Sequence, residues 1–199
     1  RTGCLMHILF FINSLAGGGA ERVTANLANH WAGCGQRVTI VTLSDVVEDV
    51  YDLEPSVRRI SLGLDRESPS FIVALYNNLR RVLALRSCLR SERPDVAIAM
   101  MTTANCLLAL AGNRYVKVIL GSERINPDRE HLGIIWTTIR RISYQWLDAV
   151  VVQTTETKEW VERNTAAVRV EVIANPVIFP LPKGLPSIAP GRYLNSNLK

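Results

Sequence analysis

The chain has 199 residues, of which 48% are hydrophobic and 21% charged, and its formal net charge is a moderate +5. This length suits one sizeable α/β domain, and the composition excludes an intrinsically disordered chain. The four cysteines form no Cys-x-x-Cys pair and the three histidines share no metal-ligand spacing. This pattern fits a reducing cytoplasm and argues against a zinc site, a disulfide framework or any metal cofactor.

The first part of the chain alternates strands with one helix. The run HILFFI at 7–12 is typical of a buried strand, and three consecutive glycines follow it at 17–19. Apolar residues then recur with helical spacing over 20–31. The run RVTIVTL at 37–43 predicts a second strand, and 57–62 a shorter third one.

The same alternation continues to residue 173. Four further strands are predicted, at 95–100, 116–120, 149–152 and 168–173. Helices are predicted between them, at 71–91, 103–111, 131–147 and 155–164. In the third of these, Ile135, Ile139, Ile142 and Trp146 share the expected apolar face. Apolar strands that alternate with helices indicate a doubly wound parallel sheet, an α/β domain of the Rossmann-like class.

The two ends of the chain depart from this pattern. Five prolines and two glycines fall within residues 175–199, which predicts a hinge or linker. Residues 1–5 precede the first strand pattern and are interpreted as a leader outside the fold. The predicted domain therefore covers 6–174. Its longest apolar stretch falls short of the roughly 20 residues that span a bilayer.

The long helix at 71–91 carries an unusual charge. Five basic residues lie between positions 71 and 93 against one acid, Glu92; they are Arg80, Arg81, Arg86, Arg90 and Arg93. The apolar residues Ile72, Leu75, Leu79 and Leu83 are expected to pack on the sheet. The arginines are then predicted to face an anionic membrane surface without insertion, which makes the protein peripheral on the cytoplasmic leaflet. A merely solvated face is the alternative; nucleic acid fits poorly, because stacking residues are lacking.

The loops after strands at the carboxyl edge of the sheet are the expected places for a ligand. Gly17, Gly18 and Gly19 precede a helix N-terminus, where free N–H groups and the helix dipole suit a diphosphate. The alternative is a tight turn with no ligand. The spacing differs from the Gly-x-Gly-x-x-Gly pattern of dinucleotide sites and from a Walker loop.

A second polar loop, GSERINP, follows the strand predicted at 116–120. Arg124 could hold an anion and Glu123 a hydroxyl group, with Ser122 and Asn126 completing an acceptor site. The alternative is a surface loop in which Ser122 and Asn126 cap the next helix. Glu123 and Arg124 are candidates for a catalytic role, but the residues alone assign none.

Taken together, these motifs resemble the N-terminal domain of family 4 glycosyltransferases, which have the GT-B fold. The segment at 6–23 resembles the family's first strand and GG-x-E-R/K loop, and 33–43 its second strand. RPDVAIAM at 93–100, DAVVVQTTE at 148–156 and VEVIANPV at 170–177 are similar to later motifs in the same order. SERINP most resembles members that add hexoses or N-acetylhexosamines to lipid-linked glycans of the bacterial envelope.

The resemblance implies a retaining hexosyltransferase with no cofactor beyond a nucleotide-diphosphate sugar as co-substrate. It implies that this domain holds a glycan or lipid-linked acceptor, and that a C-terminal domain absent from this chain holds the donor. Gly18 and Gly19 would meet the donor diphosphate, and the isolated chain would be inactive. Many members carry a histidine where this chain has Ser122, Glu123 and Arg124. A nucleotide-cofactor domain of an oxidoreductase and a non-catalytic binding module remain as alternatives.

Overall fold

The computed structural model describes residues 5–65, 70–112, 114–127, 130 and 132–175. They form a seven-stranded sheet in which every pairing is parallel, with the order β3-β2-β1-β4-β5-β6-β7. The strands are β1 (His7–Ile12), β2 (Arg37–Thr42), β3 (Arg58–Ser61), β4 (Val96–Met100), β5 (Val118–Ser122), β6 (Ala149–Val152) and β7 (Val170–Val172). The predicted fold class, a doubly wound parallel sheet, is confirmed.

Five α-helices connect the strands: α1 (Gly19–Gly33), α2 (Phe71–Glu92), α3 (Thr102–Gly112), α4 (Ile134–Ser143) and α5 (Thr155–Asn164). Two short 3-10 turns, η1 (Val46–Glu48) and η3 (Tyr144–Trp146), complete the described elements. None of the helices in the described ranges is both long and apolar enough to cross a membrane. The predicted linker, apart from residue 175, lies outside the described residues.

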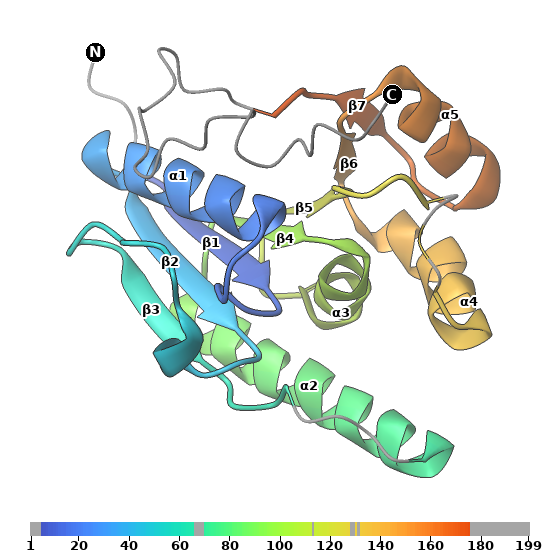
Figure 1. Ribbon diagram of the computed structural model, residues 1–199, viewed down its shortest axis with the longest axis horizontal. Helices are drawn as coiled ribbons and strands as arrows, with labels where there is room; N and C mark the ends of the chain where they lie inside the picture. Colours follow the sequence, from blue (N-terminus) through green and yellow to red (C-terminus); the bar gives the residue numbers. More distant parts are fainter. Residues whose placement is uncertain (1–4, 66–69, 113, 128–129, 131, 176–199) are drawn as a thin grey trace, which may run out of the picture.

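The helices divide between the two faces of the sheet (Figure 1). On one face α1 is the helix that the described residues supply, with Ala20, Val23 and Ala28 buried against alternate residues of β1 and β2. On the other face α2, α3 and η3 pack over β1, β4 and β5 in a second apolar cluster that contains Leu85 and Leu89. The strands β1 and β2 are therefore buried from both sides, which explains why their sequences are so apolar, whereas the edge strands β3 and β7 are partly exposed.

The chain starts at β1 and winds first toward β3, then returns to β4 and winds toward β7. The direction of winding thus changes between β1 and β4. Loops at the carboxyl ends of these two strands diverge, and ligands of open α/β sheets bind in the crevice that this divergence opens. The candidate site is therefore expected at the ends of β1, β4 and β5.

The sequence misplaced the apolar face of α2. Ile72, Leu75, Leu79 and Leu83 were expected to pack on the sheet, yet each is more than half exposed. Leu85 and Leu89 are fully buried in their place. At 100° per residue, Leu83 and Leu85 lie on nearly opposite sides of the helix. The helix is also about 33 Å long against about 20 Å for the longest strands, and its start extends past the sheet (Figure 1).

The helix expected at 131–147 is also altered. Its α-helical part is shorter, and two members of its predicted apolar face, Ile135 and Ile142, are about half exposed. The buried residues of α4 are instead Ser143 and Arg140, whose guanidinium lies 4.4 Å from the ring centre of Trp160 and pairs with Glu130 at 3.3 Å. A stacked and paired arginine satisfies its charge, so it can replace an apolar side chain in the interior.

Candidate functional site

The glycine loop lies at the carboxyl end of β1. Gly17 has φ +117°, a backbone conformation that favours glycine, whereas Gly18 is extended and forms the N-cap of α1. No described side chain caps this helix start. The first N–H groups of α1 therefore keep their capacity to bind an anion, and the positive end of the helix dipole supports it.

Two side chains control access to Gly18. The hydroxyl of Tyr51 accepts from the Gly18 N–H at 3.0 Å and donates to the Gly18 carbonyl at 2.7 Å, which fixes the loop. The carboxylate of Glu21 lies over the Gly18 Cα, so that a Cβ added there would come within 2.4 Å of its Oε2. A phosphate group at this helix start thus requires the Glu21 side chain to turn away. Tyr51 belongs to no recognisable motif, so the sequence did not identify it as a residue of this site.

The second predicted segment follows β5, which is shifted toward the C-terminus relative to the expected strand and includes Ser122. The Ser122 N–H donates to the side-chain oxygen of Asn105, and the buried Ser122 hydroxyl finds no partner among the described residues. Ser122 therefore does not cap α4, whose N-cap is Gly133. Asn126 is partly exposed in the loop between them.

Glu123 lies directly after β5 and is almost completely buried. Its carboxyl group is hydrogen-bonded to the hydroxyl groups of Thr102, at 2.7 Å, and of Tyr144. Asn105 donates in turn to the Tyr144 oxygen at 3.1 Å. Burial raises the pKa of Glu123, while the two hydroxyl donors oppose this shift. Burial likewise raises the pKa of Tyr144 well above its ordinary value, which keeps the phenol protonated as a donor.

The distances around the Thr102 hydroxyl indicate that one of the two neighbouring carboxyl groups is protonated. The single hydroxyl of Thr102 lies 2.7 Å from Oε2 of Glu123 and 2.8 Å from Oε2 of Glu130. One hydroxyl hydrogen cannot serve two acceptors, so one of the carboxyl groups must itself donate. Glu130 is paired with Arg140, whereas Glu123 forms no ion pair with a described cation. We therefore assign the proton to Glu123, where it is shared with the Thr102 hydroxyl.

Arg124 lies beside this cluster at the ends of β5, β6 and β7. Its guanidinium donates to the side-chain oxygen of Asn175, which also accepts from Gln153 at 3.1 Å. Its Nε atom is buried and finds no partner among the described residues. Desolvation lowers the pKa of Arg124, and no described carboxylate is paired with it. Arg124 thus keeps a cation with spare donors at the carboxyl edge, which suits an anionic or hydroxyl-rich ligand.

Hydrogen bonds connect the loops into one site. Asn13, after β1, donates to the hydroxyl of Thr103 at 3.0 Å, next to the Thr102 that contacts Glu123. Met101 between β4 and these threonines has φ +81°, an uncommon conformation for a residue with a side chain. Backbone of this kind concentrates at functional sites, and here it turns the two threonines toward the neighbouring loops.

A pocket of about 240 Å³ opens at the same edge. Its lining residues come from the loops after β1, β2 and β3 and from α2, α3 and α4, and they are Asn13, Leu43, Asp65, Arg81, Thr103, Leu107 and Trp136. An indole face beside amide, hydroxyl and guanidinium groups is a suitable surface for a sugar ring. The sequence analysis assigned Arg81 to a membrane contact and did not single out Thr103 or Trp136; the polar residues that directly follow the strands were the available signal.

The five arginines expected to face a membrane do not share one environment. Arg81 turns inward, where it donates to the Leu64 carbonyl at 2.8 Å, and it lines the pocket described above. Arg80, Arg86 and Arg90 are exposed along α2. Arg93 is exposed too, but it ends the helix in a left-handed conformation (φ 47°). The predicted contact with a membrane therefore concerns Arg80, Arg86 and Arg90 in the first place.

Comparison with known proteins identifies the family. The family model described as glycosyl transferase 4-like domain matches residues 18–176. Among curated proteins, an α-1,4-N-acetyl-D-galactosaminyltransferase of Campylobacter jejuni is 32% identical over 177 residues, which cover 88% of this chain and 47% of that protein. Its name gives its acceptor as GalNAc-α-(1→4)-GalNAc-α-(1→3)-diNAcBac-PP-undecaprenol. This chain thus spans about half the length of that relative.

Solved structures show the same architecture. The apo form of the lipopolysaccharide outer core galactosyltransferase WaaB superposes with a TM-score of 0.64 at 16% identity, covering 86% of this chain and 46% of that one. Sucrose-phosphate synthase from Thermosynechococcus elongatus superposes with a TM-score of 0.65 at 14% identity, covering 84% of this chain and 48% of that one. Both matches establish the fold as one Rossmann-like half of the GT-B architecture.

Proposed function

The chain belongs to the glycosyl transferase 4-like family, and we propose that it is the acceptor-side half of a two-domain hexosyltransferase. A C-terminal domain outside this chain holds a nucleotide-diphosphate sugar, and the two halves close around the donor and acceptor. The reaction is the transfer of the hexose with retention, without a resident metal or organic cofactor. Membership of this family argues against the alternative of a nucleotide-cofactor domain of an oxidoreductase, which the glycine spacing already disfavoured.

The observation that carries this proposal is the assembly of three features at one edge of the sheet. The uncapped start of α1 at Gly18 is suited to a diphosphate, and Arg124 supplies a cation with spare donors. The pocket that contains Trp136 opens at the same edge, beside the ends of β1 and β2. Adjacent parallel strands are about 4.8 Å apart, so the ends of β1 and β5 are separated by about 10 Å, the scale of a sugar with its phosphate.

The acceptor proposed is a glycan carried by a lipid. The Campylobacter relative acts, by its name, on a saccharide linked through a diphosphate to undecaprenol, and this chain is 32% identical to it. The transferase then works in envelope glycan synthesis at the cytoplasmic face of the membrane. The glycan end binds in the pocket beside Trp136 and Arg81, and Arg124 contacts its hydroxyl or anionic groups.

Glu123 is proposed as a positioning residue for this site. Its carboxyl is almost fully buried and cannot reach a ligand directly, but it fixes Thr102 and the loop that carries Arg124. A catalytic residue is not assigned among the described side chains.

The glycine loop provides the test in the full-length protein. Gly18→Val should reduce turnover of a nucleotide sugar by orders of magnitude, because the added side chain blocks the approach of a phosphate to the helix start. The fold should remain intact, since Gly18 is extended and the atoms nearest to the new Cβ belong to the movable Glu21 side chain. Gly33→Val is the matched control: it alters the other end of α1, where a Cβ meets no atom within 4 Å.

Near wild-type turnover of Gly18→Val would mean that the loop is only a structural turn, and would remove the main support for the donor contact.

A second measurement tests which domain binds the nucleotide sugar. The 199-residue chain by itself should show no turnover and no calorimetric binding of nucleotide sugars at micromolar concentrations. Micromolar affinity would place the donor site in this half and contradict the proposal.

A further inference from the structure

A second pocket lies at the edge of the sheet opposite the candidate site. Its volume of about 460 Å³ exceeds the 240 Å³ of the pocket that contains Trp136. Tyr115 precedes β5 and Trp146 precedes β6, and both line this second pocket, so it opens where these parallel strands begin. Arg86 of α2 and the last turn of α3 complete its walls. The two pockets share no described lining residue.

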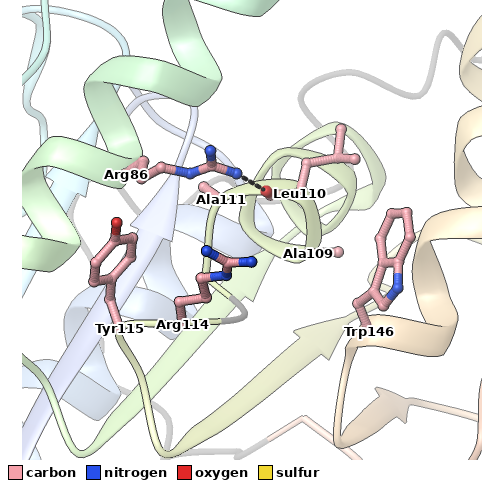
Figure 2. Close-up of a pocket in the computed structure, with 7 residues that line it drawn as sticks. All are labelled: Arg86, Ala109, Leu110, Ala111, Arg114, Tyr115 and Trp146. Carbon is pink, nitrogen blue, oxygen red and sulfur yellow. Dashed lines mark hydrogen bonds between the residues drawn. The ribbon is translucent and has the colours of Figure 1, made fainter.

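Two arginines give the second pocket a positive charge. Figure 2 shows the Arg86 and Arg114 side chains near each other at the end of α3. Arg86 donates to the Leu110 carbonyl at 2.9 Å, whereas Arg114 bonds to no other described residue. Each guanidinium has five N–H donors, so most of these donors remain available to a ligand. Since no acid is among the described residues that line the pocket, the two cations favour an anionic ligand.

The remaining walls suit a ring with hydroxyl groups. The Trp146 side chain lies across the pocket from the arginines (Figure 2), and the residue is 38% exposed. An indole offers a rigid apolar surface against which a sugar ring can pack. The last carbonyl groups of a helix lack partners within it, so the end of α3 can accept hydrogen bonds from sugar hydroxyls. The phenol of Tyr115 can donate or accept.

We propose that this second pocket binds a soluble sugar phosphate. The phosphate group contacts Arg86 and Arg114, and the sugar ring lies against Trp146 with hydroxyl groups toward the end of α3. A phosphate monoester carries a charge of about −1.5 to −2 at pH 7, which two arginines balance. Inorganic phosphate by itself would leave most of the pocket unfilled, because a molecule as small as water takes up only about 30 Å³ in the liquid.

This inference goes beyond the proposed function and does not depend on it, because the second pocket and the candidate site lie at opposite edges of the sheet. A nucleotide sugar carries its diphosphate between two sugar rings and has no terminal phosphate group. It is therefore not the ligand expected in the second pocket. The protein can then hold a phosphorylated sugar without occupying the candidate site.

The test is calorimetric titration of the full-length protein with glucose 6-phosphate. We expect a dissociation constant below about 1 mM, which should rise at about 1 M salt because the contact is charged. Glucose and inorganic phosphate should each bind at least about tenfold more weakly, because each makes only part of the contacts. Gly18→Val alters the candidate site and should bind glucose 6-phosphate as the wild type does. Loss of binding in Gly18→Val would place the sugar phosphate in the candidate site and overturn the inference.

Variants of the second pocket separate its two contacts. Arg114→Ser should weaken glucose 6-phosphate binding about tenfold or more, since charge-assisted hydrogen bonds are lost. Trp146→Ala should weaken it about tenfold and leave the binding of inorganic phosphate unchanged. Arg86 is left in place because it also bonds to α3.

Arg80→Ser is the matched control, since it removes the same charge from an exposed position of α2 that does not line the pocket. It should bind glucose 6-phosphate as the wild type does, and Arg114→Ser should keep the wild-type melting temperature because Arg114 is exposed. Equal losses in Arg114→Ser and Arg80→Ser would contradict the inference, as would wild-type protein that does not bind glucose 6-phosphate at about 1 mM. Tighter binding of uridine monophosphate than of glucose 6-phosphate would assign the pocket to a nucleotide and exclude the sugar phosphate.

Discussion

Two buried glutamates lie at opposite edges of the sheet, and their charges are satisfied in different ways. Glu92 ends α2 at the edge where the strands begin, and its carboxylate pairs with Arg37 and Arg58 at 3.1 and 3.2 Å. Glu123 lies at the edge where the strands end, and its carboxyl meets hydroxyl groups and no paired cation among the described residues. Both side chains are at least nine-tenths buried, so exposure does not distinguish them.

The difference between the partners of Glu92 and of Glu123 fits the positions of the two glutamates at opposite edges of the sheet. Ligands of open α/β sheets bind at the carboxyl ends of the strands, so the opposite edge is free to serve stability alone. A carboxylate that is held by two arginines joins the starts of β2 and β3 to the end of α2. A carboxyl group that is held by hydroxyls stays neutral and orients the loop beside it without adding charge to the site. Three predictions test this contrast.

The largest expected effect is on stability when Glu123 is truncated. Glu123→Ala leaves the hydroxyls of Thr102 and Tyr144 without this hydrogen-bond partner and opens a cavity in a buried region, at a cost of about 3 kcal/mol. Glu92→Ala should cost about 1 kcal/mol, because the two arginines it frees are more than half exposed and can be solvated. Urea unfolding measures both. Equal losses would mean that the two carboxyl groups are not held differently.

The next effect is on the pH dependence of stability. The pKa of Glu123 is raised in the fold, chiefly by burial, so the folded protein binds this proton more tightly than the unfolded chain does. Its stabilising contribution is therefore complete below the ordinary glutamate pKa, near pH 4.5, and declines as the pH rises toward the folded pKa, by about 1.4 kcal/mol for each unit of the shift.

Glu123→Gln mimics the neutral acid, since its amide can donate to Thr102 and its oxygen can accept from Tyr144. The variant should match the wild type near pH 4.5 and exceed it in stability at pH 8. Other groups titrate in this range; for example, burial lowers the pKa of His7. The free energy of unfolding of the variant relative to the wild type isolates Glu123 from them. A difference that stays constant with pH would show that Glu123 is ionised in the fold.

The sequence was sufficient for the fold because the strands are apolar throughout and the helices are bounded by recognisable residues. Ser70 and Thr154 cap α2 and α5 with side-chain hydrogen bonds, and Pro94 follows the end of α2. The orientation of α2 about its own axis was not available in the same way. Its apolar residues occupy two faces, and local periodicity does not say which face meets the sheet, because tertiary contacts decide that.

The candidate site was predictable in its position but not in its chemistry. Strand ends followed by Gly18 and by Glu123 located the two loops, since parallel strands all end at one edge of a sheet. The hydroxyl partners of Glu123 come from α3 and from the turn after α4, at 21 residues on either side, and no local pattern links them. The carboxyl group that the sequence analysis interpreted as a ligand contact therefore lies in the interior, against Thr102 and Tyr144.

The smallest expected effect concerns Glu92→Gln. The glutamine keeps the shape of the side chain and can still accept a hydrogen bond from Arg37 or Arg58, so the change removes charge attraction alone. Ion pairs whose cations are half exposed contribute little, and we expect a loss below about 1 kcal/mol at low salt. The loss should shrink further at about 1 M salt, where charges are screened over about 3 Å. Urea unfolding at both salt concentrations provides the measurement. A loss as large as that of Glu123→Ala would reverse the contrast, because the arginine-held carboxylate would then be the more sensitive of the two.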